Sequence, residues 1–326
     1  MSILQDLIPR PTGSVRETAG AALPLNRIRS VSGDSAAAEM LCRRLHAFGL
    51  DAEPVAVGGV ITLETGRANA GWSLEITADG VRIDAATAAD CDYAAEALVQ
   101  LIALAARAGL ATDALPAGHI DDCARYPWRG FMIDSARHFQ SVANLKLLID
   151  ALSALRFNVL HWHLTDHQSW RLGAALGDPA LAAVADLEAG QYSRADIAEV
   201  VGHASARHIE IIPEIDLPGH NAALCKAHPE LACNPAHPAG EVCLGKPEVR
   251  RYLGALIREI VALFPDSRYL HLGGDEAETR EWEQCPDCRR AMTAAGLTSI
   301  RELENHFMRE MTQTVVDAGR TPIVWA

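Results

Sequence analysis

The stretch YLHLGGDE, residues 269–276, has the pattern of a buried strand that ends in two glycines and two acids. Its first four residues form a largely apolar run, and Gly273 and Gly274 have no Cβ, so backbone or ligand can approach them closely. The carboxyl end of such a strand is where α/β folds place their functional sites. Asp275 and Glu276 are therefore candidate functional residues, and the competing interpretation is a solvated turn after a strand.

Length, composition and charge limit what the chain can be. Its 326 residues are enough for about two domains, and 49% hydrophobic with 22% charged residues is ordinary for a globular protein. A net charge of −13 argues against binding to nucleic acid or to an anionic membrane surface. No apolar run is long enough to span a bilayer, and the first residues, MSILQDLIPRPTGS, lack the basic flank and apolar core of a secretory signal. We therefore expect a cytoplasmic protein with no nucleic-acid or membrane partner; a periplasmic or exported location is the alternative.

The chain contains eight cysteines, and without a secretory signal these are expected to be reduced thiols. Cys285 and Cys288 form a CPDC pair, but no second pair of this spacing lies nearby, so zinc is only weakly supported and local packing or a redox-labile pair is favoured. Cys233 and Cys243 flank a Pro/Gly-rich loop and would form a disulfide only in an exported protein. We predict neither a metal nor another cofactor.

The first third of the chain predicts a small accessory domain. Residues 1–20 show no periodicity and are interpreted as a leader, and residues 21–115 have an α+β pattern. The elements expected in this domain are a helix over 36–48, a hairpin over 72–83 and a second helix over 93–108. A linker rich in Asp and Ala, over residues 110–127, is expected to follow.

Residues 125–326 alternate between apolar strands and amphipathic helices. Strands are expected to begin near Phe131, Asn158, Ile209, Tyr269 and Thr321. Helices between them are expected to begin at Ser141, at the capping box of Ser193 and Asp196, at Pro247, and at Ser299 with Glu302. This alternation predicts a parallel sheet, either doubly wound or closed as a (β/α)8 barrel.

Polar side chains gather where the predicted strands end. The first strand supplies Asp134 and Arg137, the second His161, His163, Asp166 and His167, the third Glu214, Asp216 and His220, and the fourth Asp275 and Glu276. Any single one of these residues could have a structural role. Acids or histidines after three successive strands are harder to explain by packing, because a buried charge costs several kcal/mol unless it is paired. Convergence at the carboxyl face of a barrel explains the set better.

A metal-dependent hydrolase is one interpretation of these residues. His161 and His163 point to the same side of a strand and resemble the paired ligands of metal-dependent barrel hydrolases. They lie three to five residues before Asp166, deep in the barrel wall, and the later strands show no evident ligand set. We therefore favour catalysis by carboxylates.

Four motifs, in order, carry a resemblance to a known family. They are RGFMIDSARH from Arg129, HWHLTDHQSW from His161, PEIDLPGH from Pro213 and HLGGDE from His271. This combination resembles the family-20 glycoside hydrolases, the β-N-acetylhexosaminidases, from about residue 125 onward, and the preceding region is similar to that family's small domain. The resemblance implies a (β/α)8 TIM barrel, with about five βα units present, preceded by a small α+β domain.

The resemblance also implies a reaction, the hydrolysis of terminal β-linked N-acetylglucosamine (GlcNAc) or N-acetylgalactosamine (GalNAc) from glycans or chitooligosaccharides. Neighbouring residues of an extended chain point in opposite directions, so Asp275 and Glu276 cannot easily serve as a nucleophile and acid about 5–5.5 Å apart. In this family the 2-acetamido oxygen of the substrate is the nucleophile. Glu276 is then expected to be the general acid and base, with a pKa raised by partial burial and the adjacent carboxylate, and Asp275 to orient the acetamido group.

By the same resemblance, further residues acquire expected roles. Substrate binding or support of the acid is assigned to Arg129, Asp166, His220 and Trp325, and support from behind the site to Asp216, His163 and Glu214. Arg129 would hold sugar hydroxyls, and Trp325 would form a wall beside the acetamide. The family usually has a second acid after Asp166, where this chain has His167, which changes the local charge.

The sequence ends at Trp325–Ala326, inside the predicted fifth strand. A barrel of this kind uses about 250 residues, whereas about 200 follow the linker. We therefore expect a truncated chain that exposes strand edges and lacks activity by itself. An enzyme fold that binds carbohydrate without turnover is the alternative function, and the intact Asp275–Glu276 pair favours the enzyme.

Overall fold

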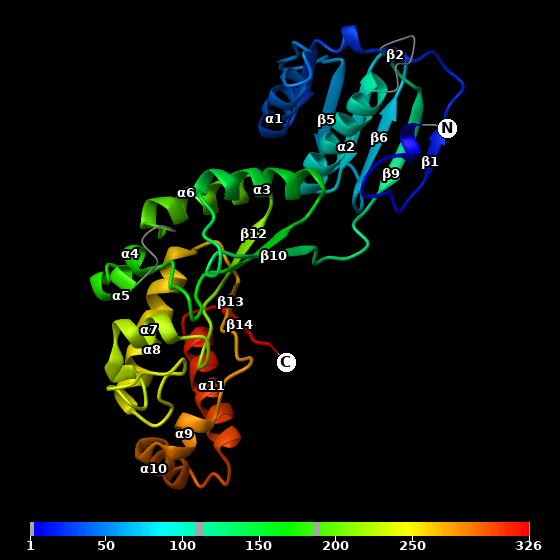
Figure 1. The fold of residues 1–326 in the computed structure, drawn as a ribbon. Helices are drawn as coiled ribbons and strands as arrows, with labels where there is room; N and C mark the ends of the chain where they lie inside the picture. The colour runs from blue at the N-terminus through cyan, green and yellow to red at the C-terminus, as the bar shows by residue number, and fades with distance from the viewer. Residues whose placement is uncertain (1–2, 108–113, 185–189, 326) are drawn as a thin grey trace. The chain divides into compact units, whose positions relative to one another are not determined.

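The computed structural model describes residues 3–107, 114–184 and 190–325. The chain divides into two compact units (Figure 1): an N-terminal unit of Met1–Arg129 with Ala151–Phe157, and a C-terminal unit of Gly130–Asp150 with Asn158–Ala326. Across the described ranges, no helix combines the length and the apolar character that crossing a membrane requires.

The N-terminal unit is built on a seven-stranded mixed sheet in the order β1-β9-β6-β7-β5-β3-β4. Its strands are β1 Val15–Glu17, β3 Ser30–Gly33, β4 Glu53–Pro54, β5 Ile61–Thr65, β6 Trp72–Ile76, β7 Val81–Ala85 and β9 Gly118–Asp122, and β2 Leu23–Pro24 pairs separately with β8 Ala114–Leu115. The helices α1 Ser35–His46 and α2 Ala88–Arg107 pack against each other and against the strands.

Local signals in this unit are confirmed. Asp34 accepts hydrogen bonds from the backbone of Ala36 and Ala37 and so begins α1. The helix ends shortly before Gly49, whose φ of +74° is a conformation that glycine adopts without strain. β6 and β7 form the predicted antiparallel hairpin. The second helix begins at Ala88 rather than at residue 93, and its predicted end at residue 108 lies outside the described residues.

Two predictions about segment boundaries are wrong. The predicted leader contributes to the fold, because Leu4 and Leu7 are fully buried and β1 pairs with β9. The predicted linker contains β8 and β9, and β9 lies between β1 and β6 in the sheet. These strands are short and pair with partners distant in sequence, so no local periodicity marks them.

The C-terminal unit contains a five-stranded sheet in chain order, and all of its strands are parallel. The strands are β10 Gly130–Asp134, β11 Val159–His163, β12 Glu210–Glu214, β13 Tyr269–His271 and β14 Thr321–Ile323. All five predicted strands are thus confirmed. Within the described residues the sheet is open at β10 and β14, and Phe131 on β10 is 41% exposed.

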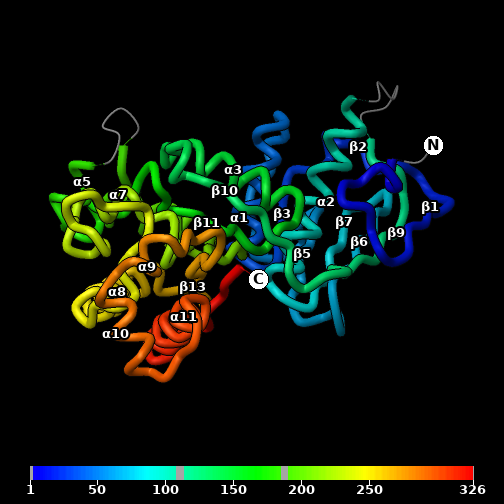
Figure 2. The backbone as a smooth tube through the Cα atoms, turned by 60° about the horizontal axis from the view of Figure 1, so that its bottom comes forward, coloured from blue at the N-terminus to red at the C-terminus, as the bar shows by residue number. Residues whose placement is uncertain are grey.

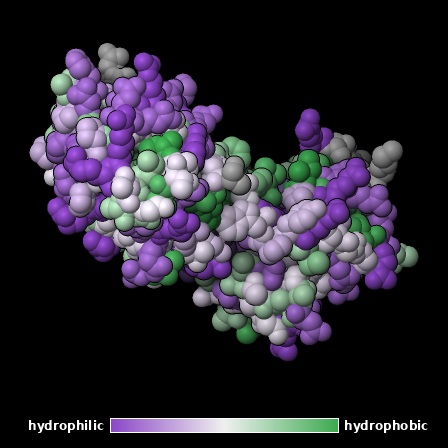
Figure 3. Space-filling model, turned by 90° about the horizontal axis from the view of Figure 1, so that it is seen from below, coloured by the Kyte–Doolittle hydropathy of each residue, from purple (hydrophilic) through white to green (hydrophobic). Residues whose placement is uncertain are grey.

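The helices of this unit also follow the predicted signals. They are α3 Val142–Ala154, whose residues from Ala151 onward belong to the N-terminal unit, α4 Gly173–Leu176, α5 Pro179–Val184, α6 Arg194–Ser205, α7 Ala222–Ala227, α8 Pro247–Leu263, α9 Arg280–Gln284, α10 Pro286–Ala294 and α11 Ile300–Asp317. Capping boxes begin α6 and α11, and Pro247 occupies the first turn of α8. Figure 2 shows α8 and α11 side by side, where they pack together. The face of the molecule in Figure 3 is largely polar, with small hydrophobic patches.

Candidate active site

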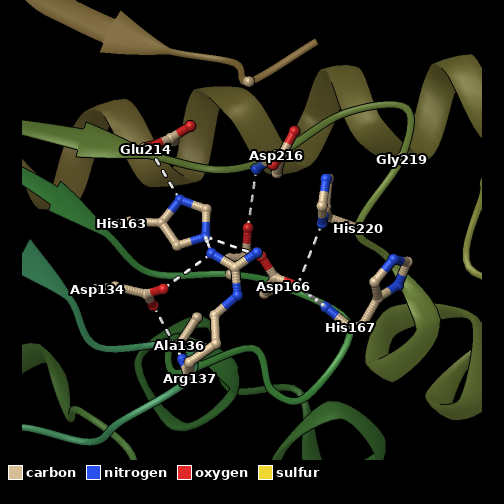
Figure 4. A network of polar contacts seen from close by, with 12 residues as sticks. Asp134, Ala136, Arg137, His163, Asp166, His167, Glu214, Asp216, Gly219 and His220 are labelled. Carbon is tan, nitrogen blue, oxygen red and sulfur yellow. Dashed lines mark hydrogen bonds and ion pairs between the residues drawn. The ribbon is translucent and has the colours of Figure 1, made fainter. Parts of the chain in front are cut away.

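The register of the parallel sheet places the strand ends at one level. Asp134 is paired with His163, His163 with Glu214, and Glu214 with His271, across β10 to β13. Because parallel strands present their carboxyl ends at the same edge, the polar residues that follow them lie close together. The predicted convergence is confirmed, and Figure 4 shows the resulting network from β10, β11, β12 and the loops after them.

Glu214 is the fully buried centre of one half of the network. Its Oε2 lies 2.7 Å from His161 Nε2 and 2.9 Å from His163 Nδ1. Its Oε1 lies 3.2 Å from His271 Nδ1 and accepts a hydrogen bond from Trp325 Nε1 at 2.9 Å. Burial by itself would raise the pKa of Glu214, but the three histidines outweigh it and hold that pKa far below its usual value. Glu214 is thus a permanent anion that fixes the ends of β11 and β13.

These distances bear on the metal interpretation of His161 and His163. Both histidines do point to one partner, Glu214, as the strand alternation predicted. Ligand atoms that share a tetrahedral zinc ion, with bonds of about 2.0 Å, stand about 3.3 Å apart. Separations of 2.7 and 2.9 Å are shorter than this and are those of close ion pairs between a carboxylate and two imidazoles. The geometry therefore favours a buried ion-pair network over a metal centre at this position.

Asp166 is the centre of the other half and is also fully buried. Its carboxylate lies 2.5 Å from Arg137 Nη2, 3.1 Å from His163 Nε2 and 3.3 Å from His220 Nδ1. The backbone N–H of His167 donates to it at 2.6 Å. Burial opposes ionisation, but these donors lower the pKa of Asp166. The acid is therefore ionised and holds four groups in place, one from β11 and three from the loops after β10, β11 and β12.

His163 joins the two halves, since it lies between Asp166 and Glu214. Burial would lower its pKa, but the two carboxylates outweigh burial and raise the pKa of His163 to about 10. His163 is therefore a buried cation at neutral pH. The sequence predicted a supporting role for His163 and Glu214, and both lie behind the exposed acids of the site.

His220 connects Asp166 to the exposed acid pair. Its Nδ1 faces Asp166, and its Nε2 lies 3.9 Å from Asp275 Oδ2 and 3.7 Å from Glu276 Oε2. A positive φ of +55° at His220 sets this orientation. The His167 ring stacks beside it, with ring centroids 4.9 Å apart. The predicted grouping of Asp166, His220 and the acid pair is confirmed in space.

The glycines of the opening motif hold the acid pair close to β12. Gly273 and Gly274 have φ of +66° and +104°, and a Cβ on Gly273 would overlap Asp216 Oδ1. Gly274 N–H donates to that same oxygen at 3.2 Å. Glycine at position 273 is therefore required for the acid-bearing loop to lie over Asp216.

Glu276 is more exposed than predicted. Its side chain is 79% exposed, whereas that of Asp275 is 36% exposed. We expected partial burial of Glu276 from the role of general acid that the family resemblance implies. The residue instead lies in a loop five residues beyond β13, with φ +51°, and that expectation is wrong.

Asp216 is a buried acid with an unusual charge state. Burial, followed by the negative charges of Asp275 and Glu214, raises the pKa of Asp216 to about 8. Its own N–H donates to Thr165 Oγ1 at 2.9 Å. Asp216 is therefore largely protonated at neutral pH, which lets it lie beside Asp275 without repulsion.

This charge state predicts a pH-dependent stability. An acid with a folded pKa near 8 and an unfolded pKa of about 3.9 stabilises the fold below pH 4 and loses that contribution as pH rises through 8. The free energy of unfolding of wild type should therefore fall relative to that of Asp216→Asn between pH 5 and pH 8.5, by on the order of 4 kcal/mol. Urea unfolding at both pH values measures this. The exposed acid variant Asp266→Asn is the control, and parallel pH profiles for wild type and Asp216→Asn would contradict the assignment.

Arg129 belongs to the N-terminal unit, whereas the residues of this cluster belong to the C-terminal unit. Arg129 precedes the amino end of β10, and its guanidinium donates to Arg156 O, Tyr126 O and Tyr93 Oη. The site lies at the opposite, carboxyl end of the strand. The prediction that Arg129 holds substrate is therefore not supported, because the direction of the strand takes it to the wrong end of the sheet.

Arg137, eight residues later, is the arginine at the site. It follows the carboxyl end of β10, and it bonds Asp134 Oδ2 at 2.8 Å in addition to Asp166 (Figure 4). Its side chain is 37% exposed, which leaves part of the guanidinium accessible. Arg137 was recognised at the strand end from the sequence, but without a role.

Asn221 was missed altogether. It is fully buried, and its Nδ2 donates to the carbonyls of Asp216 and Pro218. These bonds close the loop that presents His220. The residue lies directly after PEIDLPGH, so a buried amide following a loop motif was the only available signal.

Comparisons with known proteins agree with this geometry. Residues 126–326 match the family described as glycosyl hydrolase family 20, catalytic domain. A β-hexosaminidase of Akkermansia muciniphila is 41% identical over 233 residues, which is 65% of this chain and 47% of that protein. A β-hexosaminidase of Vibrio furnissii is 28% identical over 98% of this chain and 56% of that protein. The chain thus spans about half the length of these curated relatives.

Solved structures show the same likeness. The family-20 exo-β-N-acetylglucosaminidase of Vibrio harveyi, in complex with N-acetylglucosamine, superposes with a TM-score of 0.87 at 25% identity, over 100% of this chain and 55% of that one. The N-acetyl-β-hexosaminidase of Streptomyces plicatus gives a TM-score of 0.82 at 29% identity, over 99% and 66%. With a family match over more than half of its residues, the chain belongs to glycosyl hydrolase family 20.

Proposed function

We propose that the full-length protein is an exo-acting β-N-acetylhexosaminidase that releases terminal β-linked GlcNAc or GalNAc from the non-reducing ends of glycans or chitooligosaccharides. Relatives named β-hexosaminidase and family-20 structures with N-acetylglucosamine bound support this substrate class. We also propose that the five parallel strands are about five βα units of a (β/α)8 barrel, which their chain-order arrangement supports.

The acid pair and its histidine carry the proposal. Asp275 Oδ2 and Glu276 Oε2 both lie within 4 Å of one atom, His220 Nε2, at the carboxyl end of the sheet. Two carboxylates on adjacent residues, turned toward one nitrogen, do not flank a glycosidic bond from opposite sides. They suit a reaction in which the nucleophile comes from the substrate.

The proposed reaction has two steps. Glu276 donates its proton to the glycosidic oxygen while the 2-acetamido oxygen attacks the anomeric carbon, so that the glycosidic bond breaks and an oxazolinium ring forms. Asp275 accepts a hydrogen bond from the acetamido N–H and stabilises the positive charge of that ring. Glu276 then removes a proton from a water molecule as the water oxygen attacks the anomeric carbon. This attack opens the oxazolinium ring and restores the β configuration.

The buried network positions these groups. Asp166 faces His220 Nδ1, which fixes the orientation of the imidazole and directs Nε2 toward Glu276. Asp216 occupies the space behind Gly273 and Gly274 and supports the loop of Asp275. We assign the holding of sugar hydroxyls to Arg137 in place of Arg129, and a wall beside the acetamide to Trp325, whose ring packs 4.5 Å from that of His271.

Two successive displacements at one carbon predict retention of configuration. Proton NMR of the full-length protein acting on an aryl β-GlcNAc should show the β-anomer of free GlcNAc first, with the α-anomer appearing only by later mutarotation. Initial formation of the α-anomer would contradict the mechanism. Tight binding of GlcNAc without any turnover would instead favour the alternative function, a carbohydrate-binding protein.

A further inference from the structure

Four cysteines from two separate segments meet in the C-terminal unit. Cys233 and Cys243 lie in the loop between α7 and α8, and Cys285 and Cys288 lie at the junction of α9 and α10 (Figure 1). Three of them are buried, and Cys233 is half-buried. The Sγ–Sγ distances are 3.7 Å for Cys233–Cys288, 3.8 Å for Cys243–Cys285 and 3.7 Å for Cys243–Cys288.

These Sγ–Sγ distances are those expected between the ligands of a tetrahedral metal ion, and we call such a distance the cage distance. Four thiolates around a tetrahedral zinc ion, with Zn–S bonds of about 2.3 Å, have sulfur atoms about 3.8 Å apart. A disulfide would instead require about 2.05 Å. One sulfur, that of Cys243, lies at the cage distance from both Cys285 and Cys288, which pairwise disulfide bonding does not explain.

The backbone around the cluster is built for this close approach. A Cβ on Gly245 would overlap the backbone of Asp287 and Cys288, so a glycine is needed where the loop contacts α10. The Cys243 N–H donates to Leu231 O at 2.7 Å and closes the loop. Trp282 Nε1 donates to Val242 O at 2.9 Å and ties α9 to the same loop.

We propose that Cys233, Cys243, Cys285 and Cys288 bind one structural zinc ion as four thiolate ligands. All four coordination positions are filled by protein, so the ion has no open position for substrate or water. The site is therefore separate from the chemistry of Asp275 and Glu276 and goes beyond the proposed function.

The position of this site gives it a mechanical role. The loop that carries Cys233 and Cys243 contacts the loop of His220, since Val242 N–H donates to Pro218 O at 3.1 Å and Asn221 N–H to Gly240 O at 2.6 Å. The other two ligands follow the loop of Asp275 and Glu276 by about ten residues. Zinc would thus fasten together the loops after β12 and β13 that present the catalytic groups.

Metal analysis of the full-length protein, purified without chelator, tests the proposal. Wild type should contain about one zinc ion per chain more than the double variant Cys285→Ser/Cys288→Ser. The matched control Cys42→Ser/Cys91→Ser changes two buried cysteines of the N-terminal unit and should keep the zinc content of wild type. Equal zinc in wild type and Cys285→Ser/Cys288→Ser would overturn the proposal, as would an intact mass four hydrogens lighter than the sequence because of two disulfides.

Cobalt substitution keeps the test valid if the double variant fails to fold. Wild type stripped of metal with a mercurial reagent and a chelator, and then given Co²⁺, should gain thiolate-to-cobalt charge-transfer absorption and the intense visible bands of a tetrahedral site. Zn²⁺ added afterwards should abolish both and raise the Tm above that of the stripped protein. A visible spectrum of octahedral cobalt, without charge transfer, would contradict a site of four thiolates.

Discussion

Replacement of Glu276 by Gln is expected to lower kcat of the full-length protein on an aryl β-GlcNAc by about 10²–10⁴-fold, the usual contribution of a general acid and base. The amide has nearly the size of the acid but can neither donate the proton to the glycosidic oxygen nor remove one from water. Steady-state kinetics measures the loss. Glu283→Gln, an exposed acid on α9, is the matched control and should leave kcat within about twofold.

The leaving group distinguishes loss of an acid from loss of the fold. A phenol of low pKa departs without protonation, so the first step of Glu276→Gln should recover on a dinitrophenyl glycoside relative to a methylumbelliferyl one. A defect of equal size on both substrates in pre-steady-state measurements would contradict the role of Glu276 as the acid. So would near-normal turnover of the variant.

Local signals in the sequence were sufficient to predict most elements of the C-terminal unit. A capping box joins two residues that are three positions apart, so both partners are visible in a short stretch of sequence. This is the case for Ser193 with Asp196 and for Ser299 with Glu302. The five strands were also predicted, because a buried parallel strand is a nearly continuous apolar run. The pairing of strands that are distant in the sequence leaves no such local pattern. β1 pairs with β9 about a hundred residues away, and both were assigned to segments without structure.

In the candidate site, too, some features follow from the local sequence and others depend on the folded structure. Strand ends in parallel register must meet, so the convergence of His163, Glu214 and Asp275 followed from their positions at or beyond the ends of the strands. The choice between Arg129 and Arg137 needed the direction of β10, which places the first arginine before the strand and the second after it. The motif RGFMIDSARH carries that direction, since its first arginine precedes the apolar run and its second follows it.

The cysteine cluster was the least predictable feature. Cys285 and Cys288 are three residues apart, and their spacing was recognised. Cys233 and Cys243 are ten residues apart in a loop, and only the contact of that loop with α10 brings them to the same place. Non-local pairing of this kind has no periodic or composition signature.

The second large effect concerns the 2-acetamido group of the substrate. In the proposed mechanism this group is the nucleophile, so a β-glucoside, with a hydroxyl in its place, has no internal group to attack the anomeric carbon. Effective molarities of well-placed internal nucleophiles are large, so the expected loss is at least about 10³-fold in kcat/KM. A thiazoline that mimics the oxazolinium ring should bind far more tightly than GlcNAc, because it resembles the species that the site stabilises.

The ratio of kcat/KM for an aryl β-GlcNAc to that for the matching aryl β-glucoside, measured on the full-length protein, is the most direct test of substrate-assisted catalysis. Such catalysis at Asp275 and Glu276 predicts a ratio of at least about 10³, with the thiazoline inhibiting the faster reaction competitively. Comparable kcat/KM values for the two substrates would show that the acetamido group takes no part in the reaction, and would contradict the proposed roles of both acids.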